Sequence, residues 1–164
     1  MVHSGGNLRD LFHRELKDIY FAEKQILRAL PKMARNAQSS ELQHAFETHA
    51  DETEQQIERL DRVFESIGQL PRGKTCDAII GLLDEGKEIM EEFADTEALD
   101  PGLLAAAQSV EHYEISRYGT LKAWAEQLGL TEAAQLLDAT LVEEKRMDEI
   151  LTKIAMVSLN EQAA

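Results

Sequence analysis

Apolar side chains recur at steps of three and four residues along almost the whole chain, and this spacing restricts the fold more than any other feature. A helix turns by about 100° per residue, so these positions share one face, whereas a half-buried strand needs an alternation that no stretch sustains. A chain of 164 residues can form one domain with a sizeable core. The sequence therefore predicts an all-α protein with a single domain over residues 1–164, a core at about 8–157 and a polar C-terminal tail.

The first two helices are predicted to form an antiparallel hairpin. One helix covers about residues 7–36, and Pro31 should kink it or end it early. Ser40, followed three residues later by Gln43, is a capping-box pattern that opens a second helix, which extends to about residue 67. Because the turn between the two helices is short, they must run side by side in opposite directions.

The segment 68–74 is the clearest break in the chain, and three further helices are predicted after it. Thr75 can cap a helix that reaches about residue 94. Asp100, with Pro101 after it, fits the start of a helix that stops near residue 129, and Thr131 caps the last one. Two hairpins joined by a long crossover form a ferritin-like four-helix bundle. We therefore expect this fold, with residues 75–94 as the helical crossover.

Potential metal ligands interrupt the apolar stripes of four predicted helices, at Glu23, His49, Glu114 and Glu144. An unpartnered buried carboxylate is disfavoured by roughly several kcal/mol, so converging carboxylates imply bound cations, protonation or a water-filled gap. Residues equidistant from a hairpin turn lie at the same height, which places Glu114 level with Glu144 and Glu23 level with Glu52. His49 lies one turn away from that layer, and a metal site is the simplest interpretation.

Two more acids extend the predicted site along the same helix faces, Glu111 one turn before Glu114 and Asp148 one turn after Glu144. Many carboxylates and few imidazoles suit iron or manganese better than thiolate-binding metals. A lone core histidine is, however, more often a hydrogen-bonded packing residue than a ligand. The predicted ligand set is Glu23, His49, Glu52, Glu111, Glu114, Glu144 and Asp148.

Five runs, in order along the chain, resemble the YciE/YciF family: ELKDIYFAEKQILRALPKMA, HADETEQQIERLDRVFE, GKTCDAIIGLLDEG, EHYEISRYGTLKAWAEQLG and LVEEKRMDEIL. The resemblance covers about residues 8–154. It implies a rubrerythrin-related, ferritin-like bundle that is commonly dimeric, is associated with bacterial stress responses, and carries a di-metal centre without a defined reaction. The usual di-iron pattern has Glu-x-x-His on two helices. Here the second helix reads His49-x-x-Glu52, reversed, and Met147 stands three residues after Glu144.

Composition limits the partners. With 17 basic and 31 acidic side chains, the net charge of −14 disfavours nucleic acid and anionic lipid. No stretch is apolar and long enough to span a bilayer, the N-terminus lacks a signal core, and Cys76 is the one cysteine, so a cytoplasmic location is expected. The crossover carries aliphatic residues on more than one side, which predicts a homodimer.

Two functions remain open at this point. The first is a stress protein that binds two iron or manganese ions and reduces dioxygen or peroxide, with Tyr118 as the best aromatic candidate for an electron relay. The second is a non-enzymatic, dimerising helical module whose buried polar layer contains water or protons in place of metal. The missing second histidine favours the module, and the number of inward-facing acids favours metal.

Overall fold

The structure, a computed structural model, describes residues 6–164, and within them it is entirely helical. Its elements are α1 (Leu8–Asn36), α2 (Ser40–Ser66), α3 (Asp77–Glu92), α4 (Leu99–Gln127), α5 (Thr131–Ile154), a π-helical segment (Ala155–Leu159) and α6 (Asn160–Gln162). No strand is present in this range. The five long helices and the predicted all-α class are confirmed.

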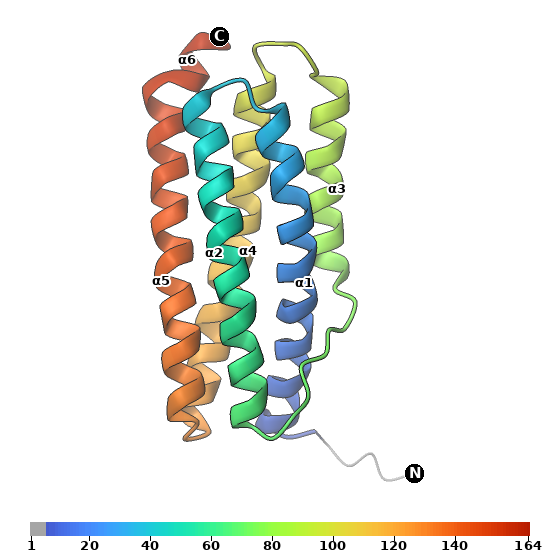
Figure 1. The fold of residues 1–164 in the computed structure, drawn as a ribbon, viewed down its shortest axis with the longest axis vertical. Helices are drawn as coiled ribbons and strands as arrows, with labels where there is room; N and C mark the ends of the chain where they lie inside the picture. Colours follow the sequence, from blue (N-terminus) through green and yellow to red (C-terminus); the bar gives the residue numbers. More distant parts are fainter. Residues whose placement is uncertain (1–5) are drawn as a thin grey trace.

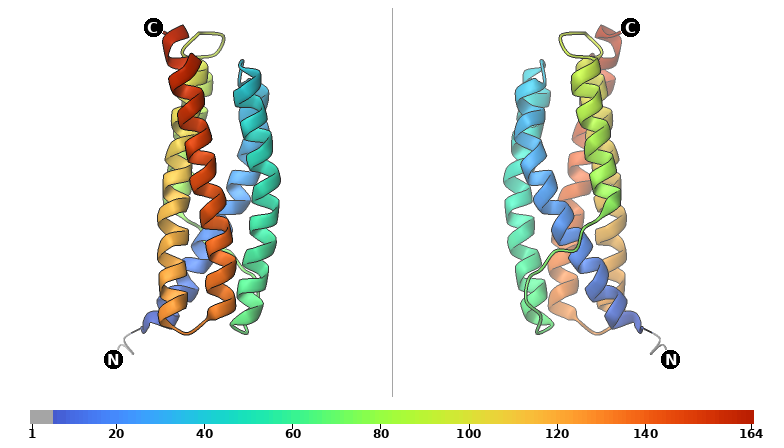
Figure 2. Two further views of the ribbon diagram at one scale, coloured as in Figure 1. Left: turned by 90° about the vertical axis from the view of Figure 1, so that its left-hand side faces the viewer. Right: turned by 90° about the vertical axis from the view of Figure 1, so that its right-hand side faces the viewer.

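Four of the long helices form the bundle, and the remaining one, α3, lies on its outside. α1 and α2 form one antiparallel hairpin and α4 and α5 the other, while α3 packs against α1 and α4 (Figure 1). The chain leaves α2 at the end of the bundle where it began, runs back across α1 as an extended segment, and then enters α3 (Figure 2). The Lys74 amide fixes this segment by donating a 3.0 Å hydrogen bond to the Lys17 carbonyl. The predicted crossover is therefore confirmed.

Helix ends agree with the sequence to within one or two residues, but several caps differ. Asn7 and Asp10 form a reciprocal capping box at α1, and the helix continues through Pro31 to residue 36, so the predicted early end is wrong. The cap of α2 is Ser39, whose hydroxyl accepts from the Leu42 amide, and not Ser40. α3 and α5 begin without a side-chain cap, so the capping roles predicted for Thr75 and Thr131 are also wrong.

Asp100 has a role that its sequence context does not indicate. It lies inside the first turn of α4, where only 4% of its surface is exposed, instead of capping that helix. Its carboxylate accepts hydrogen bonds from the amides of Gln38 (2.8 Å) and Ser39 (2.6 Å). These amides precede α2, so Asp100 ties the α1–α2 turn to the start of α4.

The crossover helix lies close to α4 because small residues face each other there. Gly86 is buried against Ala106, and a Cβ at Gly102 would come within 2.7 Å of the Ile89 Cγ2 atom. Only glycine fits at that position without displacing Ile89. These close approaches fix how α3 packs against α4.

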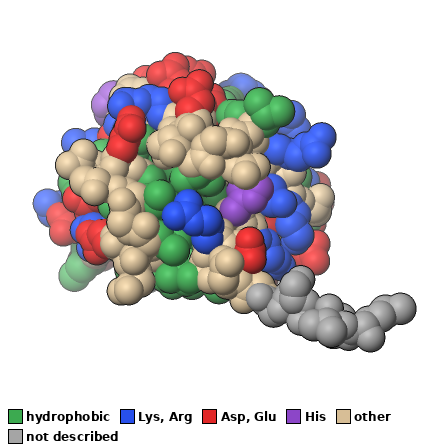
Figure 3. All heavy atoms as spheres, turned by 90° about the horizontal axis from the view of Figure 1, so that it is seen from below, with side chains coloured by type: hydrophobic (Ala, Val, Ile, Leu, Met, Phe, Trp, Pro, Cys, Tyr) green, Lys and Arg blue, Asp and Glu red, His purple; other side chains and the backbone are tan. Residues whose placement is uncertain are grey.

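The surface at one end of the bundle is mixed in character. At the end that carries the N-terminus, basic and acidic side chains are interspersed with apolar ones (Figure 3). Among residues 6–164, no helix combines the length and apolarity needed to cross a membrane.

Candidate metal centre

The bundle core contains a layer of ionisable side chains that are almost completely enclosed. Glu23 comes from α1, His49 from α2, Glu111 and Glu114 from α4, and Glu144 from α5. Each has at most 2% of its surface exposed. The helical spacing that fills the core with leucine and phenylalanine places these residues inward too, so every helix of the bundle contributes to the layer.

His49 is the centre of this layer. Its Nδ1 atom lies 2.9 Å from Glu111 Oε1, and its Nε2 atom lies 3.6 Å from both Glu114 Oε2 and Glu144 Oε2. One ligand atom from each of these four residues falls within 4.8 Å of all the others. Such a group, drawn from α2, α4 and α5, has the size and composition of a metal site.

Glu23 faces the group from α1, across the bundle. The hydroxyl of Tyr118, which is fully buried, donates a hydrogen bond to Glu23 Oε1. The other oxygen, Oε2, has no hydrogen-bond partner. Tyr118 therefore holds one carboxylate oxygen and leaves the second available to a cation.

Burial disfavours the charged form of these acids. It raises the pKa of Glu23 to about 8, with a further contribution from Glu144, and it raises the pKa of Glu111 to about 8. The pKa values of Glu114 and Glu144 are raised well above 4.5, first by burial and then by neighbouring carboxylates. Without a cation, the layer at neutral pH therefore retains protons or contains destabilising charge.

Most polar atoms of the layer lack hydrogen-bond partners. Both oxygens of Glu114 and Glu144 are in this state, as is Nε2 of His49, and Glu111 has no hydrogen bond beyond its 2.9 Å ion-pair contact with His49 Nδ1. Buried polar groups in folded proteins are nearly always paired, because each unpaired group costs roughly 1–3 kcal/mol. This many unpaired acceptors around one point fits a site that receives cations.

The α2–α5 side of the layer is enclosed by ion pairs that spacing along a single helix does not reveal. Arg59 makes a two-point contact with Glu143, at 2.7 Å and 2.6 Å, and Gln56 donates to the same carboxylate at 3.1 Å. Although burial acts in the opposite direction, these contacts lower the pKa of Glu143. Glu143 is partly exposed, and its position along α5 does not show that Arg59 of α2 lies opposite it.

Two predicted ligands lie outside the four-residue group. Glu52 forms an ion pair with Arg146, while its second oxygen is buried and unpaired. Asp148 contacts Gln108 at 3.3 Å and His112 at 3.1 Å, toward the surface. Their ligation stays a prediction, and Asp148 would have to give up these partners to contribute.

The profile of a family described as a domain of unknown function, DUF892, matches residues 7–164. The chain belongs to the DUF892 family. Protein YciF of Escherichia coli (strain K12), to which this DUF892 chain is similar, is 47% identical over 157 residues, covering 95% of each chain. The predicted YciE/YciF resemblance is confirmed.

Solved structures agree with the fold of this DUF892 chain. The structure of the Escherichia coli stress protein YciF matches with a TM-score of 0.90 and 46% identity, covering 94% of this chain and 98% of that one. YcfI from Rhodopseudomonas palustris, described as a proposed structural protein, matches with a TM-score of 0.88 and 46% identity over 93% and 97%. A Xanthomonas campestris protein matches with a TM-score of 0.72 and 25% identity over 96% and 98%.

Proposed function

We propose that this chain is a ferritin-like, di-metal carboxylate protein of the bacterial stress response that acts in the cytoplasm. In this proposal the buried layer holds iron or manganese and reduces dioxygen or peroxide. The unpaired oxygens of Glu114 and Glu144 are the observation that carries it, because they face one imidazole and are enclosed in the core. The description of Escherichia coli YciF as a stress protein supports the biological setting.

The donor set fits such ions. One imidazole nitrogen and several carboxylate oxygens form a hard, anionic environment, which suits iron or manganese and disfavours metals that prefer thiolates. His49 with Glu114 and Glu144 would hold one ion, and Glu23, with a neighbouring carboxylate, would hold the second. When bound, such ions supply redox equivalents and Lewis acidity.

The surrounding side chains prepare the layer for this task. Glu111 lies beside Nδ1 of His49, so it orients the ring with Nε2 facing Glu114 and Glu144. Tyr118 holds one oxygen of Glu23 and keeps a proton at the edge of the layer. The apolar core around these groups excludes bulk water, which strengthens electrostatic interactions within the site.

Metal analysis tests the proposal directly. Protein purified without chelator should contain iron or manganese, approaching about two ions per chain after loading. The Glu114→Gln/Glu144→Gln variant should contain neither above background, since amides are weak ligands. Equal metal content in the two proteins would place the ions elsewhere and refute the site.

Peroxide consumption tests the chemistry separately from binding. At equal free metal, loaded wild-type protein should consume hydrogen peroxide faster than the same double variant. Equal rates, in the presence of confirmed binding, would leave a metal-binding protein without this activity.

A non-enzymatic module is the second candidate, and one observation favours it. The relative from Rhodopseudomonas palustris, at 46% identity, is described as a proposed structural protein. In such a module the buried acids would be protonated, as their raised pKa values permit, and would fix helix register. Metal should then leave the melting temperature unchanged.

We also propose a homodimer that forms through α3. Ile80 on this helix and Phe93, the C-cap residue directly after it, are exposed by 36% and 42%, although both are large and apolar. Covering them in a second copy would remove apolar surface from water. Sedimentation should therefore give a dimer at micromolar concentration, and Phe93→Glu should shift it toward monomer. A wild-type monomer would refute the proposal.

A further inference from the structure

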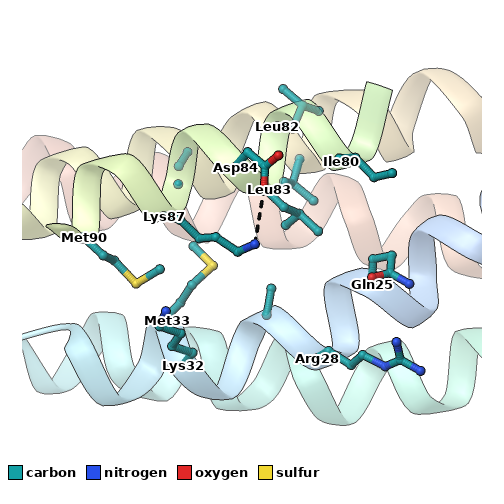
Figure 4. A pocket seen from close by; sticks show the side chains of 14 residues that line it. Gln25, Arg28, Lys32, Met33, Ile80, Leu82, Leu83, Asp84, Lys87 and Met90 are labelled. Atoms are coloured by element: carbon teal, nitrogen blue, oxygen red, sulfur yellow. Dashed lines mark hydrogen bonds and ion pairs between the residues drawn. The ribbon is translucent and has the colours of Figure 1, made fainter. Parts of the chain in front are cut away.

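A groove of about 250 Å³ lies on the outside of the bundle, between α1 and α3 and above α4 (Figure 4). Met33 from α1, Leu83 and Met90 from α3, and Ala106 and Val110 from α4 form its apolar floor. Methionine and leucine present flexible, polarisable surfaces that adapt to apolar ligands. The floor can therefore contact an apolar molecule over its whole length.

The rim of this groove is basic, in a chain whose net charge is −14. Arg28 and Lys32 stand on α1, with Lys87 opposite on α3 (Figure 4). Lys87 is paired with Asp84 at 3.2 Å. Arg28 and Lys32, both exposed, have no ion-pair partner among residues 6–164. Two unpaired cations beside an apolar floor are complementary to an anionic head group attached to an apolar body.

A second, smaller hollow continues from the groove into the core. It shares Met33, Leu83 and Val110 with the groove and ends on His49. Its volume of about 10 Å³ is room for one water molecule at most. Apart from His49, the residues that line it are all apolar, so it receives a methyl or methylene end and excludes a charged one.

We propose that the groove binds a small molecule with one anionic head group and an apolar chain, such as a medium-chain carboxylate. The head contacts Arg28 and Lys32, and the chain lies along Met33 and Leu83 with its end toward the hollow at His49. The groove is smaller than the roughly 300–1,000 Å³ of drug-sized sites, so it fits one short chain and not a peptide helix. This binding requires no metal and stands independently of the proposed centre.

Methionine-methyl NMR on the metal-free, full-length protein tests the proposal, with octanoate below its micellar concentration as the probe. The methyl signals of Met33 and Met90 should shift saturably, while that of Met156, which is 73% exposed on the C-terminal segment, should not. 1-Octanol, which lacks the charge, should bind more weakly. Because this experiment uses wild-type protein, its outcome does not depend on whether a variant folds.

Charge reversal tests the head-group contacts. Arg28→Glu with Lys32→Glu should weaken octanoate binding by about tenfold or more, since two attractions become repulsions. Lys145→Glu with Lys153→Glu, at exposed positions on α5 outside the groove, is the matched control and should bind as the wild type does. Three outcomes overturn the proposal: no saturable shift, equal affinity for octanol and octanoate, or signals that respond to protein concentration alone, which would mean that a second copy occupies the groove.

Discussion

Replacing Glu114 and Glu144 by glutamine should stabilise the metal-free protein at neutral pH and abolish its stabilisation by metal. Both pKa values are raised well above 4.5, first by burial and then by neighbouring carboxylates. In the unfolded chain these groups are ionised at pH 7, whereas in the fold they retain protons. Folding without metal therefore takes up protons, and this costs free energy that a neutral amide does not require.

The magnitude follows from the pKa shift. One pKa unit corresponds to about 1.4 kcal/mol, so a carboxyl whose pKa is raised well above 4.5 by burial and that stays protonated at pH 7 costs roughly 3 kcal/mol on folding. Glutamine removes this cost but provides a different set of hydrogen-bonding atoms. We therefore expect each substitution to raise the free energy of unfolding of the metal-free protein by about 2–3 kcal/mol. Because the two sites are neighbours, the double variant should gain less than twice that. At about 2–4 °C per kcal/mol, the melting temperature should rise by at least roughly 5 °C.

Urea unfolding in the presence of chelator at several pH values is the assay. Glu23 and Glu111 have pKa values of about 8, so the folded protein binds more protons than the unfolded chain between about pH 4.5 and 8. The stability of the metal-free wild type should therefore fall as pH rises through this window, by about 1.4 kcal/mol per unit for each extra proton. Saturating manganese should restore the stability of the wild type. At a free manganese concentration one hundred times the dissociation constant, the gain is about 2.7 kcal/mol.

Glu54→Gln with Glu149→Gln is the matched control, because it makes the same chemical change at exposed positions on α2 and α5. It should leave both the pH dependence and the effect of manganese unchanged. The reasoning is refuted if Glu114→Gln/Glu144→Gln is less stable than wild type at pH 8 in chelator. It is also refuted if wild-type stability in chelator rises between pH 5 and 8.

Two further predictions concern hydrogen bonds that hold the layer in place. Asp100→Ala should lower the free energy of unfolding by about 2–3 kcal/mol, because the amides of Gln38 and Ser39 lose their acceptor. Urea unfolding will measure this loss, and an unchanged unfolding midpoint would contradict the role of Asp100. Tyr118→Phe should raise the pKa of Glu23 further, because the hydroxyl hydrogen bond lowers it, and carboxyl NMR titration of the metal-free protein will show the shift or its absence.

The helices and the inward acids could be predicted because both depend on spacing along one helix. A step of three or four residues fixes which side chains share a face, and equal distances from a tight turn fix which residues share a height. Glu114 and Glu144 satisfy both conditions, and their Oε2 atoms both lie 3.6 Å from His49 Nε2. The prediction of these residues in one layer needed no information on how the two hairpins are rotated about each other.

Contacts that depend on that rotation could not be predicted. Asp100 sits where a helix N-cap is common, yet its carboxylate reaches a turn some sixty residues earlier in the sequence. Asp148 continues the apolar seam of α5 by spacing, but it lies at the edge of that seam, where His112 and Gln108 bind it. Both outcomes follow from the packing of one hairpin on the other, which spacing along a single helix does not determine.

The two sides of the buried layer differ in a way that decides how a small molecule reaches it. On the α2–α5 side, Arg59 with Glu143 and Arg146 with Glu52 cross between the helices, and a molecule entering there would have to break charged hydrogen bonds. On the side facing α3, the hollow that ends on His49 is lined otherwise by apolar residues, which separate on thermal motion without breaking any ion pair. Access from the groove beneath α3 is therefore the easier route. An uncharged molecule such as dioxygen or undissociated peroxide would enter by this apolar route.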